Sequence, residues 1–559
     1  MKKNQLYTVD ITDLNNLGNG VAKIDGKAVF VPRAVDGDRL EIKIIKDAKD
    51  YAVARIEKIL TPSPYRKESG CAVANRCGGC VYRHITYAHE LELKRNYVAS
   101  AFRKAGVTVE VAPTLSGAES GYRNKVQYPV GEGMTFGFYA PRSHDIIPSA
   151  DCALQDEAFA PILAEIARLL RQSGVSVYNE VTHTGLLRHV YLRCGSVSGE
   201  IMVTLVTSSA KFPQGKAFAE QISKKFPEIV SVVQNVNPEK TNVILSDRCI
   251  TLWGKDHLTD TLCGLTFNLS PLSFYQVNHH MAEVLYAKAQ ELAELRSGDR
   301  IADLFCGAGT IGLSVAAKHP EISLLGVEII PEAVENAKEN AKQNGITNAA
   351  FICGDANSSE LAGADVIFLD PPRKGCEESL VKQIAALRPR KVVYISCNPD
   401  TLARDVARFV ETGYTPGVVY PVDLFPRTGH CEAVVALTRE STQHQMKLQP
   451  SPFEKIKSGV KTIELRLYDE KRQQIKAGDA IEFTNTANGE KIRATVKKLH
   501  RFGSFAELYN SLPLLKCGYT AEDVDSAHPC DMEQYYSAEE QKAYGVVGIE
   551  LVSIESIAQ

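Results

Sequence analysis

The chain has 559 residues, 44% of them hydrophobic and 23% charged, which is enough for several globular domains and excludes a wholly disordered protein. Its formal net charge is only −3, so no global positive field attracts nucleic acid, and any such binding must depend on local basic patches. The first residues carry no apolar run behind their lysines, and no segment reaches the ~18 apolar residues of a membrane span. We therefore expect a cytoplasmic, monomeric protein that does not enter a membrane.

The first 60 residues are predicted to form short strands separated by turns. The strands are expected at residues 7–13, 20–24, 27–31, 39–46 and 51–60. Asp25-Gly26 and residues 36–38 supply turns between them. So many strands in so short a range predict that residues 1–60 are an OB-like β-barrel domain. Such barrels often bind nucleic acid, but the same pattern also suits a barrel with a purely structural role.

Four of the cysteines have the spacing of a metal site. In a chain without a secretory signal, cysteines are expected as thiols, metal ligands or catalysts rather than as disulfides. Cys71, Cys77 and Cys80 lie within ten residues, two glycines separate the last two, and Cys152 is the obvious fourth ligand. Four thiolates suit zinc and an iron-sulfur cluster equally well, so the spacing does not choose between them.

Residues 61–265 are predicted to form a central mixed α+β domain that contains this metal site. A hairpin is expected within residues 187–207. Arg123 and Lys125 follow Tyr122, and cations beside an aromatic ring are one pattern of an RNA contact. Exposed basic side chains commonly have no such specific role.

Residues 266–440 carry the pattern of a Rossmann-like domain. A helix is expected over 281–295 and a strand over 300–305, and the glycine-rich turn 307–312 opens the next helix. The following strand ends at Glu328, 21 residues after the first glycine of this turn, where an acidic side chain can bind the hydroxyls of a ribose. Taken alone, these features also fit a dinucleotide site.

Asp370 and Cys397 favour a different cofactor. A buried strand at 365–369 delivers Asp370, followed by two prolines, to the carboxyl edge of the sheet. S-adenosylmethionine methyltransferases place such a loop beside the methyl donor, whereas a nicotinamide site has no comparable need for it. The strand 391–396 ends directly before Cys397, which we therefore expect at the same edge.

A cysteine beside a methyl donor indicates a particular acceptor atom. Methyltransferases that act on oxygen or amine nitrogen need no thiol, because their acceptor is already a nucleophile. C5 of a pyrimidine becomes nucleophilic only after a thiolate has added to C6, and a base must then remove the C5 proton so that the thiol can leave. Cys397 is the candidate nucleophile, and Glu432, directly before the apolar strand 433–437, is the candidate base.

Residues 5–439 resemble the RNA uracil-5-methyltransferases of the RumA and TrmA type. The matching motifs are Cys71-x5-Cys77-x2-Cys80 with Cys152, Phe274-Tyr275-Gln276-Val277-Asn278, Asp303-Leu304-Phe305-Cys306-Gly307-x-Gly309, Asp370-Pro371-Pro372-Arg373, Ser396-Cys397-Asn398-Pro399 and Phe425-Pro426-x-Thr428-x-His430-x-Glu432. One departure is Phe305, where relatives often have tyrosine. The lost hydroxyl puts a cofactor contact in doubt, but not the chemistry.

This resemblance implies a function and a set of site residues. The function is S-adenosylmethionine-dependent methylation of uridine C5, with an N-terminal TRAM domain that binds RNA and a [4Fe-4S] cluster. The implied roles are nucleophile for Cys397, base for Glu432, cofactor contacts for Gln276, Phe305, Glu328 and Asp370, and cluster ligands for Cys71, Cys77, Cys80 and Cys152. The cluster cysteines favour the branch that acts on 23S ribosomal RNA over the tRNA branch.

Residues 445–559 lie outside that resemblance. The segment 459–466 resembles the Gly-x-Lys-x-x-Glu-x-Arg signature of ASCH domains, which are small β-barrels related to RNA-binding PUA folds. Lys461 and Glu464 are candidates either for catalysis on modified nucleosides, as in some relatives, or for an ion pair that supports an RNA-binding cleft, which we favour. Residues 447–501 hold 13 Lys and Arg against 7 Asp and Glu. This basic half is expected to bind RNA, although a solvated surface of mixed charge fits as well.

Two other classes of function fit part of the sequence. A redox-sensing RNA-binding protein, whose cluster governs affinity, would bind RNA without consuming S-adenosylmethionine. A methyltransferase of exocyclic nitrogens would share the Asp370 loop, but those loops commonly end in an aromatic residue and here Arg373 follows. An oxidoreductase is weaker still, because nothing resembles a hydride-acceptor site. The sequence therefore predicts a multidomain α/β RNA methyltransferase.

Overall fold

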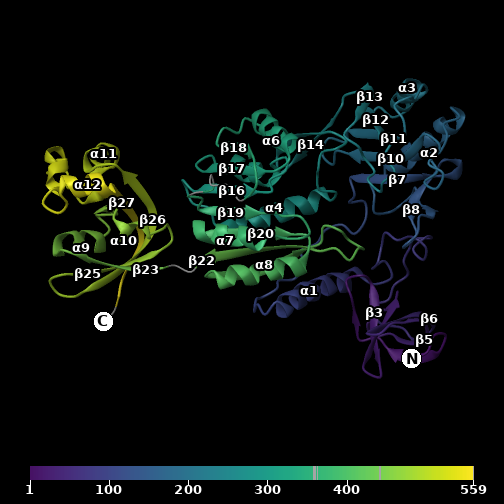
Figure 1. Ribbon diagram of the computed structural model, residues 1–559, viewed down its shortest axis with the longest axis horizontal. Helices are drawn as coiled ribbons and strands as arrows, with labels where there is room; N and C mark the ends of the chain where they lie inside the picture. Colours follow the sequence, from purple (N-terminus) through teal and green to yellow (C-terminus); the bar gives the residue numbers. More distant parts are fainter. Residues whose placement is uncertain (357–360, 362, 440–441, 558–559) are drawn as a thin grey trace. The chain divides into compact units, whose positions relative to one another are not determined.

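The computed structural model describes residues 1–356, 361, 363–439 and 442–557, and Figure 1 traces their elements along the chain. The chain forms two compact units. The first comprises Met1–Leu387, Lys391–Thr412 and Pro416–Leu437, and the second comprises Arg388–Arg390, Gly413–Thr415 and Thr438–Gln559. None of the described helices is both long enough and apolar enough to cross a membrane.

A six-stranded sheet forms the N-terminal part of the first unit, in the order β1-β5-β6-β4-β3-β2. Its strands are β1 (Leu6–Asp10), β2 (Asp13–Leu14), β3 (Asn19–Ile24), β4 (Lys27–Pro32), β5 (Arg39–Asp47) and β6 (Tyr51–Thr61). The strand-rich prediction is confirmed. The single strand expected at 7–13 is divided, because Ile11 instead bonds to the backbone of Gly37 (2.8 Å) and Asp38 (2.9 Å). Alternate residues of β5, such as Leu40 and Ile42, are buried in the core of this sheet.

A seven-stranded sheet forms the central part of the first unit, in the order β13-β12-β11-β10-β7-β8-β9. After α1 (Tyr87–Lys104), its elements are β7 (Lys125–Gly131), β8 (Thr135–Tyr139), β9 (Ile146–Pro148), α2 (Phe159–Gln172), β10 (Leu187–Cys194), β11 (Ile201–Thr207), α3 (Gly215–Lys225), β12 (Ile229–Val236) and β13 (Cys249–Gly254). The predicted hairpin is present as the antiparallel pair β10 and β11. Residues of α2 and α3 cover the sheet face that carries Val126 and Leu192.

A two-stranded hairpin leads into a second seven-stranded sheet, in the order β18-β17-β16-β19-β20-β22-β21. The elements are β14 (Leu258–Leu262), β15 (Leu265–Leu269), α4 (His279–Ala293), β16 (Arg300–Leu304), α5 (Thr310–Lys318), β17 (Ser323–Glu328), α6 (Pro331–Gln343), β18 (Ala349–Cys353), β19 (Val366–Leu369), α7 (Glu378–Leu387), β20 (Lys391–Ser396), α8 (Pro399–Glu411), β21 (Tyr414–Val422) and β22 (Glu432–Arg439). β18, β17, β16, β19 and β20 pair in parallel. The chain order reverses between β16 and β19, which is where open α/β sheets bind ligands.

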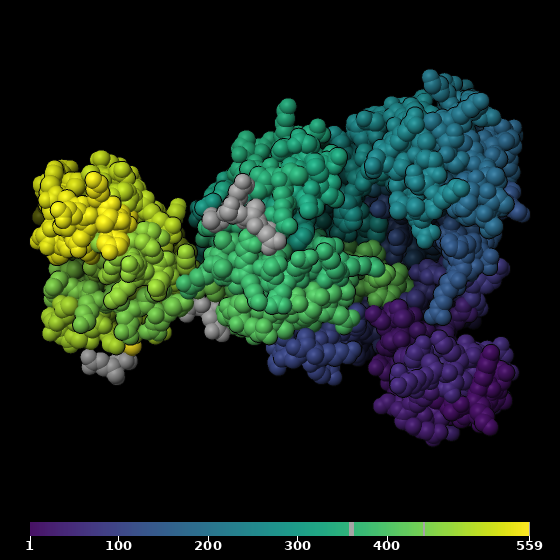
Figure 2. Space-filling model, viewed as in Figure 1, coloured from purple at the N-terminus to yellow at the C-terminus, as the bar shows by residue number. Residues whose placement is uncertain are grey.

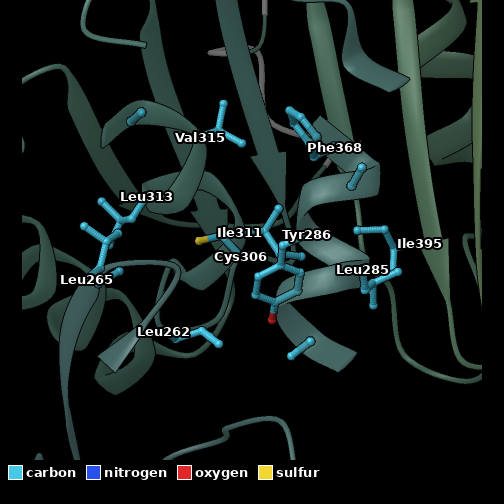
Figure 3. Packing of buried hydrophobic residues seen from close by; sticks show 14 of the residues in the cluster. Leu262, Leu265, Leu285, Tyr286, Cys306, Ile311, Leu313, Val315, Phe368 and Ile395 are labelled. Atoms are coloured by element: carbon cyan, nitrogen blue, oxygen red, sulfur yellow. The ribbon is translucent and has the colours of Figure 1, made fainter. Parts of the chain in front are cut away.

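Different helices cover the two faces of this sheet. Residues of α4, α5 and α6 pack over the face that carries Phe368 and Ile395, and Leu262 of β14 joins the same core (Figure 3). Tyr394 points to the opposite face, where its hydroxyl donates a hydrogen bond of 2.7 Å to Asp405 of α8. With both faces covered by helices, the strand ends are where polar side chains can meet a ligand.

The second unit, whose residues 442–557 are coloured yellow-green to yellow in Figure 2, holds a five-stranded sheet in the order β23-β25-β26-β27-β24. Its elements are β23 (Gln443–Leu448), α9 (Pro450–Lys457), β24 (Ile463–Leu467), α10 (Glu470–Gln473), β25 (Ala480–Asn485), β26 (Lys491–Phe502), α11 (Phe505–Ser511), α12 (Ala538–Tyr544) and β27 (Val546–Ser556). One hydrophobic cluster includes Phe453 and Ile481, and a second includes Leu465 and Phe505.

Candidate active site

Cys397 lies at the carboxyl end of β20, as predicted. All six residues of β20 are buried, so the strand is held in the middle of the sheet and Cys397 is the first residue beyond it. Asn398 then caps α8, with its side chain accepting the backbone N–H of Asp400 (3.1 Å). This cap fixes the turn and leaves the thiol half-buried at the sheet edge.

The surroundings of Cys397 are acidic on one side and basic on the other. Burial raises the pKa of the Cys397 thiol, the carboxylates of Glu432 and Asp370 raise it further, and Arg373 opposes them. Two carboxyl groups and one guanidinium therefore lie within electrostatic reach of the sulfur. The structure thus brings both predicted catalytic residues together with one of the predicted cofactor contacts.

Glu432 is the first residue of β22 and is buried. Burial raises the pKa of its carboxyl to about 8, with the charge of Asp370 adding to the rise and Arg373 opposing it. A carboxyl group with this pKa is an effective proton acceptor near neutral pH. The sequence predicts Glu432 directly before a strand at 433–437, whereas in the structure Glu432 is the first residue of that strand, β22.

Arg373 is held over the start of α8. Its carbonyl oxygen accepts hydrogen bonds from Asn398 Nδ2 (3.1 Å) and Thr401 Oγ1 (3.2 Å). Its guanidinium Nη2 lies 3.3 Å from Nδ1 of His430, and burial followed by the charge of Arg373 lowers the pKa of that imidazole. The loop after Asp370 and the loop before Glu432 therefore meet beside the thiol.

The turn after β16 has the geometry of a nucleotide-binding loop. Phe305 adopts a left-handed backbone conformation (φ 62°), which is strained for a residue with a side chain. Asp303 Oδ2 accepts the backbone N–H of Gly312 (2.9 Å), and a Cβ at Gly312 would lie 2.7 Å from that oxygen, so only glycine fits. The backbone N–H of Gly307 donates to Glu328 Oε2 (3.1 Å). Phe305 and Glu328 thus border the same loop.

Asp370 connects this loop to the thiol. Burial raises the pKa of its carboxyl to about 7. Its charge in turn contributes to the raised pKa values of Asp303, Cys397 and Glu432. The carboxyl group therefore lies within electrostatic reach of both the glycine turn and the catalytic residues.

Tyr286 of α4, labelled in Figure 3, links Gln276 to Asp370 and to the start of α5. Its hydroxyl lies 3.2 Å from Thr310 Oγ1 at the start of α5. Burial raises the pKa of that hydroxyl, whereas hydrogen bonds with Thr310 and Gln276 oppose the rise, and the charge of Asp370 adds to it. The four predicted cofactor contacts, Gln276, Phe305, Glu328 and Asp370, thus border one region.

Comparisons with known proteins agree with this geometry. A family model for a methyltransferase domain matches residues 295–419, a TRAM domain model matches residues 2–56, and an ASCH domain model matches residues 446–555. The chain is 43% identical over 451 residues to an uncharacterized RNA methyltransferase of Bacillus cereus, covering 78% of this chain and 98% of that protein. A relative from Halalkalibacterium halodurans, also described as an RNA methyltransferase, is 44% identical with the same coverage.

This chain belongs to the RNA methyltransferase family. Among solved structures it resembles the Pyrococcus abyssi tRNA (uracil-54, C5)-methyltransferase in complex with S-adenosyl-L-homocysteine, with a TM-score of 0.65 and 28% sequence identity. The match covers 77% of this chain and 100% of that one. The expected TRAM, methyltransferase and ASCH domains are therefore confirmed.

In this RNA methyltransferase, a buried charge network fixes the loop that leads to Glu432. Arg427 has a left-handed backbone (φ 71°), and its backbone N–H and Nη1 donate to the two oxygens of Glu90 in α1 (2.7 and 3.1 Å). Its carbonyl oxygen accepts the N–H groups of Val81 and Tyr82 (2.9 and 3.2 Å). Lys94 of α1 is buried between Glu90 and Asp423. All these charges are paired, and the contacts tie the loop before Glu432 to α1.

The four predicted cluster ligands lie near one another. Burial raises the pKa of the Cys80 thiol to about 12, and the charges of Cys152, Cys77 and Cys71 add to the rise. Within the part of the chain that the structure describes, however, no three His, Cys, Asp or Glu side chains are arranged to hold a metal ion. The four thiols are chemically suited to bind a metal as thiolates. They are not arranged as a metal site, so the structure does not confirm the expected cluster.

The ASCH domain of this RNA methyltransferase contains the predicted ion pair. Lys461 Nζ lies 2.9 Å from Glu464 Oε2, and Arg466 Nη2 lies 2.9 Å from Glu464 Oε1. Glu464 is buried, and Arg466 Nη1 also donates to the hydroxyl of Tyr536 (3.2 Å). All three charged residues of the signature are therefore engaged with one another.

Two residues of the site had no assigned role in the sequence analysis. Burial raises the pKa of Asp303 to about 7, and Asp370 and Glu328 contribute to that rise. Asp303 was visible as a carboxylate ahead of the glycine turn. Tyr286 was not distinguishable from other apolar positions of its helix, because its contact with Thr310 depends on the packing of α4 against α5.

Proposed function

We propose that this RNA methyltransferase transfers a methyl group from S-adenosylmethionine to C5 of a uridine in RNA, through a covalent bond between Cys397 and C6. The observation that supports it best is that Cys397, Glu432 and Asp370 lie within electrostatic reach of one another. A methyl acceptor that is already nucleophilic would leave both the thiol and the base without a role. Gln276, Phe305, Glu328 and Asp370 are proposed to bind the methyl donor.

The proposed steps use the side chains in a fixed order. The Cys397 thiolate adds to C6, and the electrons of the C5–C6 double bond move so that C5 becomes nucleophilic. C5 then attacks the methyl carbon of S-adenosylmethionine. The bond from sulfur to that carbon breaks with its electrons remaining on sulfur, S-adenosylhomocysteine leaves, and C5 is a tetrahedral carbon with one proton and one methyl group. Glu432 removes that proton, the double bond re-forms, and the Cys397 sulfur leaves C6.

The raised pKa values set the direction of the pH dependence. Glu432 acts as a base only when ionised, and its pKa is about 8, so its ionised fraction rises as pH approaches that value. The thiol, whose pKa burial also raises, becomes a better nucleophile in the same direction. Arg373 is the positive group beside both, and its charge favours both ionised forms.

The proposed RNA is 23S ribosomal RNA. The cysteine motif supports this choice, because among enzymes of the resembled type it favours the ribosomal branch. A tRNA uridine is the second candidate, since the Pyrococcus abyssi structure is described as a tRNA (uracil-54, C5)-methyltransferase. Mapping 5-methyluridine in both RNA classes, in cells that lack this protein, separates the two.

We also propose a [4Fe-4S] cluster on Cys71, Cys77, Cys80 and Cys152. A cluster of this kind would neutralise four neighbouring thiolates and join the segment 71–80 to residue 152. The ranges 1–60, 61–265, 266–440 and 445–559 are retained as proposed domain limits.

The covalent step has a direct test. With RNA that contains 5-fluorouridine, the fluorine at C5 cannot be removed as a proton, so the adduct with Cys397 should persist on a denaturing gel. Cys397→Ala should form no adduct, whereas the exposed Cys249→Ala should behave like the wild type. An undiminished adduct in Cys397→Ala would exclude this nucleophile. Binding of RNA without any consumption of S-adenosylmethionine would instead favour a redox-sensing RNA-binding protein.

A further inference from the structure

Lys125 and Arg193 form a pair of like charges on the central sheet. In the antiparallel pairing of β7 with β10, the two residues are direct register partners, so their side chains project from the same face. Like charges directly opposite one another destabilise a sheet. A pair of this kind is expected where an anion is bound part of the time.

This pair is on the face opposite the core of α2 and α3. The adjacent residues Val126 and Leu192 point into that core, so Lys125 and Arg193 point away from it. Arg193 is buried, and its guanidinium donates to the carbonyl oxygens of Ser270 (3.0 Å) and Ser273 (2.6 Å). These bonds fix its position without neutralising its charge.

The pair has no acidic partner among the residues that the structure describes. No ion pair joins a carboxylate to Lys125, Arg193 or Arg123 in that part of the chain. Burial, then Arg193, then Arg123 lower the pKa of the Lys125 ammonium to about 8, and no carboxylate opposes them. Three positive groups therefore lie together, with Lys125 and Arg123 half-buried and Arg193 buried.

Arg123 extends this positive charge toward His430, which lies in the loop before Glu432. Its charge contributes to the lowered pKa of Lys125 and also to that of His430, which lies beside Arg373. Next to it, Asn124 Nδ2 donates to the carbonyl oxygen of Gln276 (3.0 Å). The cations therefore border both the catalytic loop and a proposed cofactor contact.

We propose that Lys125, Arg193 and Arg123 form a subsite for a phosphate group of the RNA backbone, close to the uridine that reacts with Cys397. Guanidinium and ammonium groups are the side chains that bind phosphate oxygens most strongly. A backbone contact of this kind sets the position of the strand without reading its sequence. The subsite rests on the proposed function, because that function supplies the RNA.

The test compares Lys125→Met with Lys224→Met in the full-length protein. Methionine keeps an apolar stem of similar length and removes the charge. Lys224 is an exposed residue of α3, on the other face of the same sheet. Affinity for a fluorescent oligouridine is measured over a range of salt concentrations without a methyl donor, and thermal unfolding is measured on the same samples.

We expect Lys125→Met to weaken binding and to reduce the slope of log affinity against log salt by about 0.7, the value for one phosphate contact to single-stranded RNA. Its melting temperature should rise, because the like-charge pair is relieved. Lys224→Met should change neither quantity. A general folding defect would lower the melting temperature and is thereby distinguished.

Three other outcomes have defined meanings. An unchanged affinity and slope in Lys125→Met would overturn the subsite. Stabilisation of the wild type, but not of Lys125→Met, by inorganic phosphate, together with an unchanged RNA slope, would assign the position to a free anion and also overturn it. A reduced slope in a protein that makes no 5-methyluridine would support the subsite and refute the proposed function.

Discussion

At the scale of single residues, the charge of Glu432 influences the ionisation of the Cys397 thiol. The carboxylate of Glu432 helps to raise the pKa of the thiol, so Glu432→Gln should lower that pKa. Adduct formation with 5-fluorouridine RNA should then begin at lower pH than in the wild type. The exposed Glu411→Gln at the end of α8 is the control. An unchanged pH midpoint would show that the two groups do not interact.

Glu432→Gln should slow the overall methylation reaction, although it should make adduct formation easier. Below the Glu432 pKa of about 8, ionisation of this carboxyl group alone should raise the wild-type rate at saturating RNA about tenfold per pH unit. The rise should be steeper where ionisation of the Cys397 thiol also limits the rate. Glu432→Gln should turn over slowly at every pH and accumulate a methylated covalent intermediate with ordinary RNA. Turnover at the wild-type rate would mean that another group accepts the proton.

The sequence predicted those residues that lie at strand ends within recognisable motifs. Cys397 and Asp370 directly follow buried parallel strands, and the carboxyl edge of a parallel sheet brings such residues together. Glu432 begins β22, so this rule does not account for its place beside them. The role of Tyr286 could not be predicted, because it depends on how α4 packs against α5. The pKa of Glu432 was also beyond the sequence, since it arises from burial by residues distant in the chain.

At the scale of elements, strands with an unbroken apolar pattern were predicted better than a strand interrupted by proline and glycine. The strand over 391–396 has the predicted limits. β21 was missed, because its sequence contains Pro416, Gly417 and Pro421, which weaken the strand pattern. β21 lies at the edge of the sheet, where proline is tolerated.

The buried network around Arg427 leads to a prediction about stability. Arg427→Met would leave the buried Glu90 carboxylate with Lys94 but without the guanidinium. Breaking a buried pair in this way costs about 3–5 kcal/mol, which urea unfolding would measure. Arg103→Met, at an exposed position in the last turn of α1, should cost far less. Equal losses in the two variants would show that the network contributes little.

At the scale of the whole molecule, the ASCH domain is expected to add RNA affinity. Arg493 and Lys498 are exposed on β26. Replacing both with glutamine should reduce the salt slope of RNA binding by about 0.7 per lost contact and leave methylation at saturating RNA unchanged. Lys542→Gln in α12 is the control, since it is exposed and lies outside the basic range 447–501. An unchanged salt slope of RNA binding would mean that these residues of the ASCH domain do not contact RNA.

The iron and sulfide content of the purified protein tests the proposed cluster. Anaerobically purified protein should contain about four iron and four sulfide per chain and be brown. Cys77→Ser should lose the colour and the iron, whereas Cys249→Ser should keep both. One zinc per chain in a colourless protein would refute the cluster and weaken the choice of ribosomal RNA.

The hydrogen bond between Arg427 and Glu90 joins residues 337 positions apart, and this separation has a consequence during synthesis. At about 5–20 residues per second, roughly 17–70 s pass between the translation of the two residues. Throughout that interval the nascent chain carries α1 with a carboxylate whose arginine partner does not yet exist. Ribosome-bound chains that end before residue 427 should therefore be cleaved by proteases near α1, and the catalytic loop should acquire its structure only as synthesis nears completion.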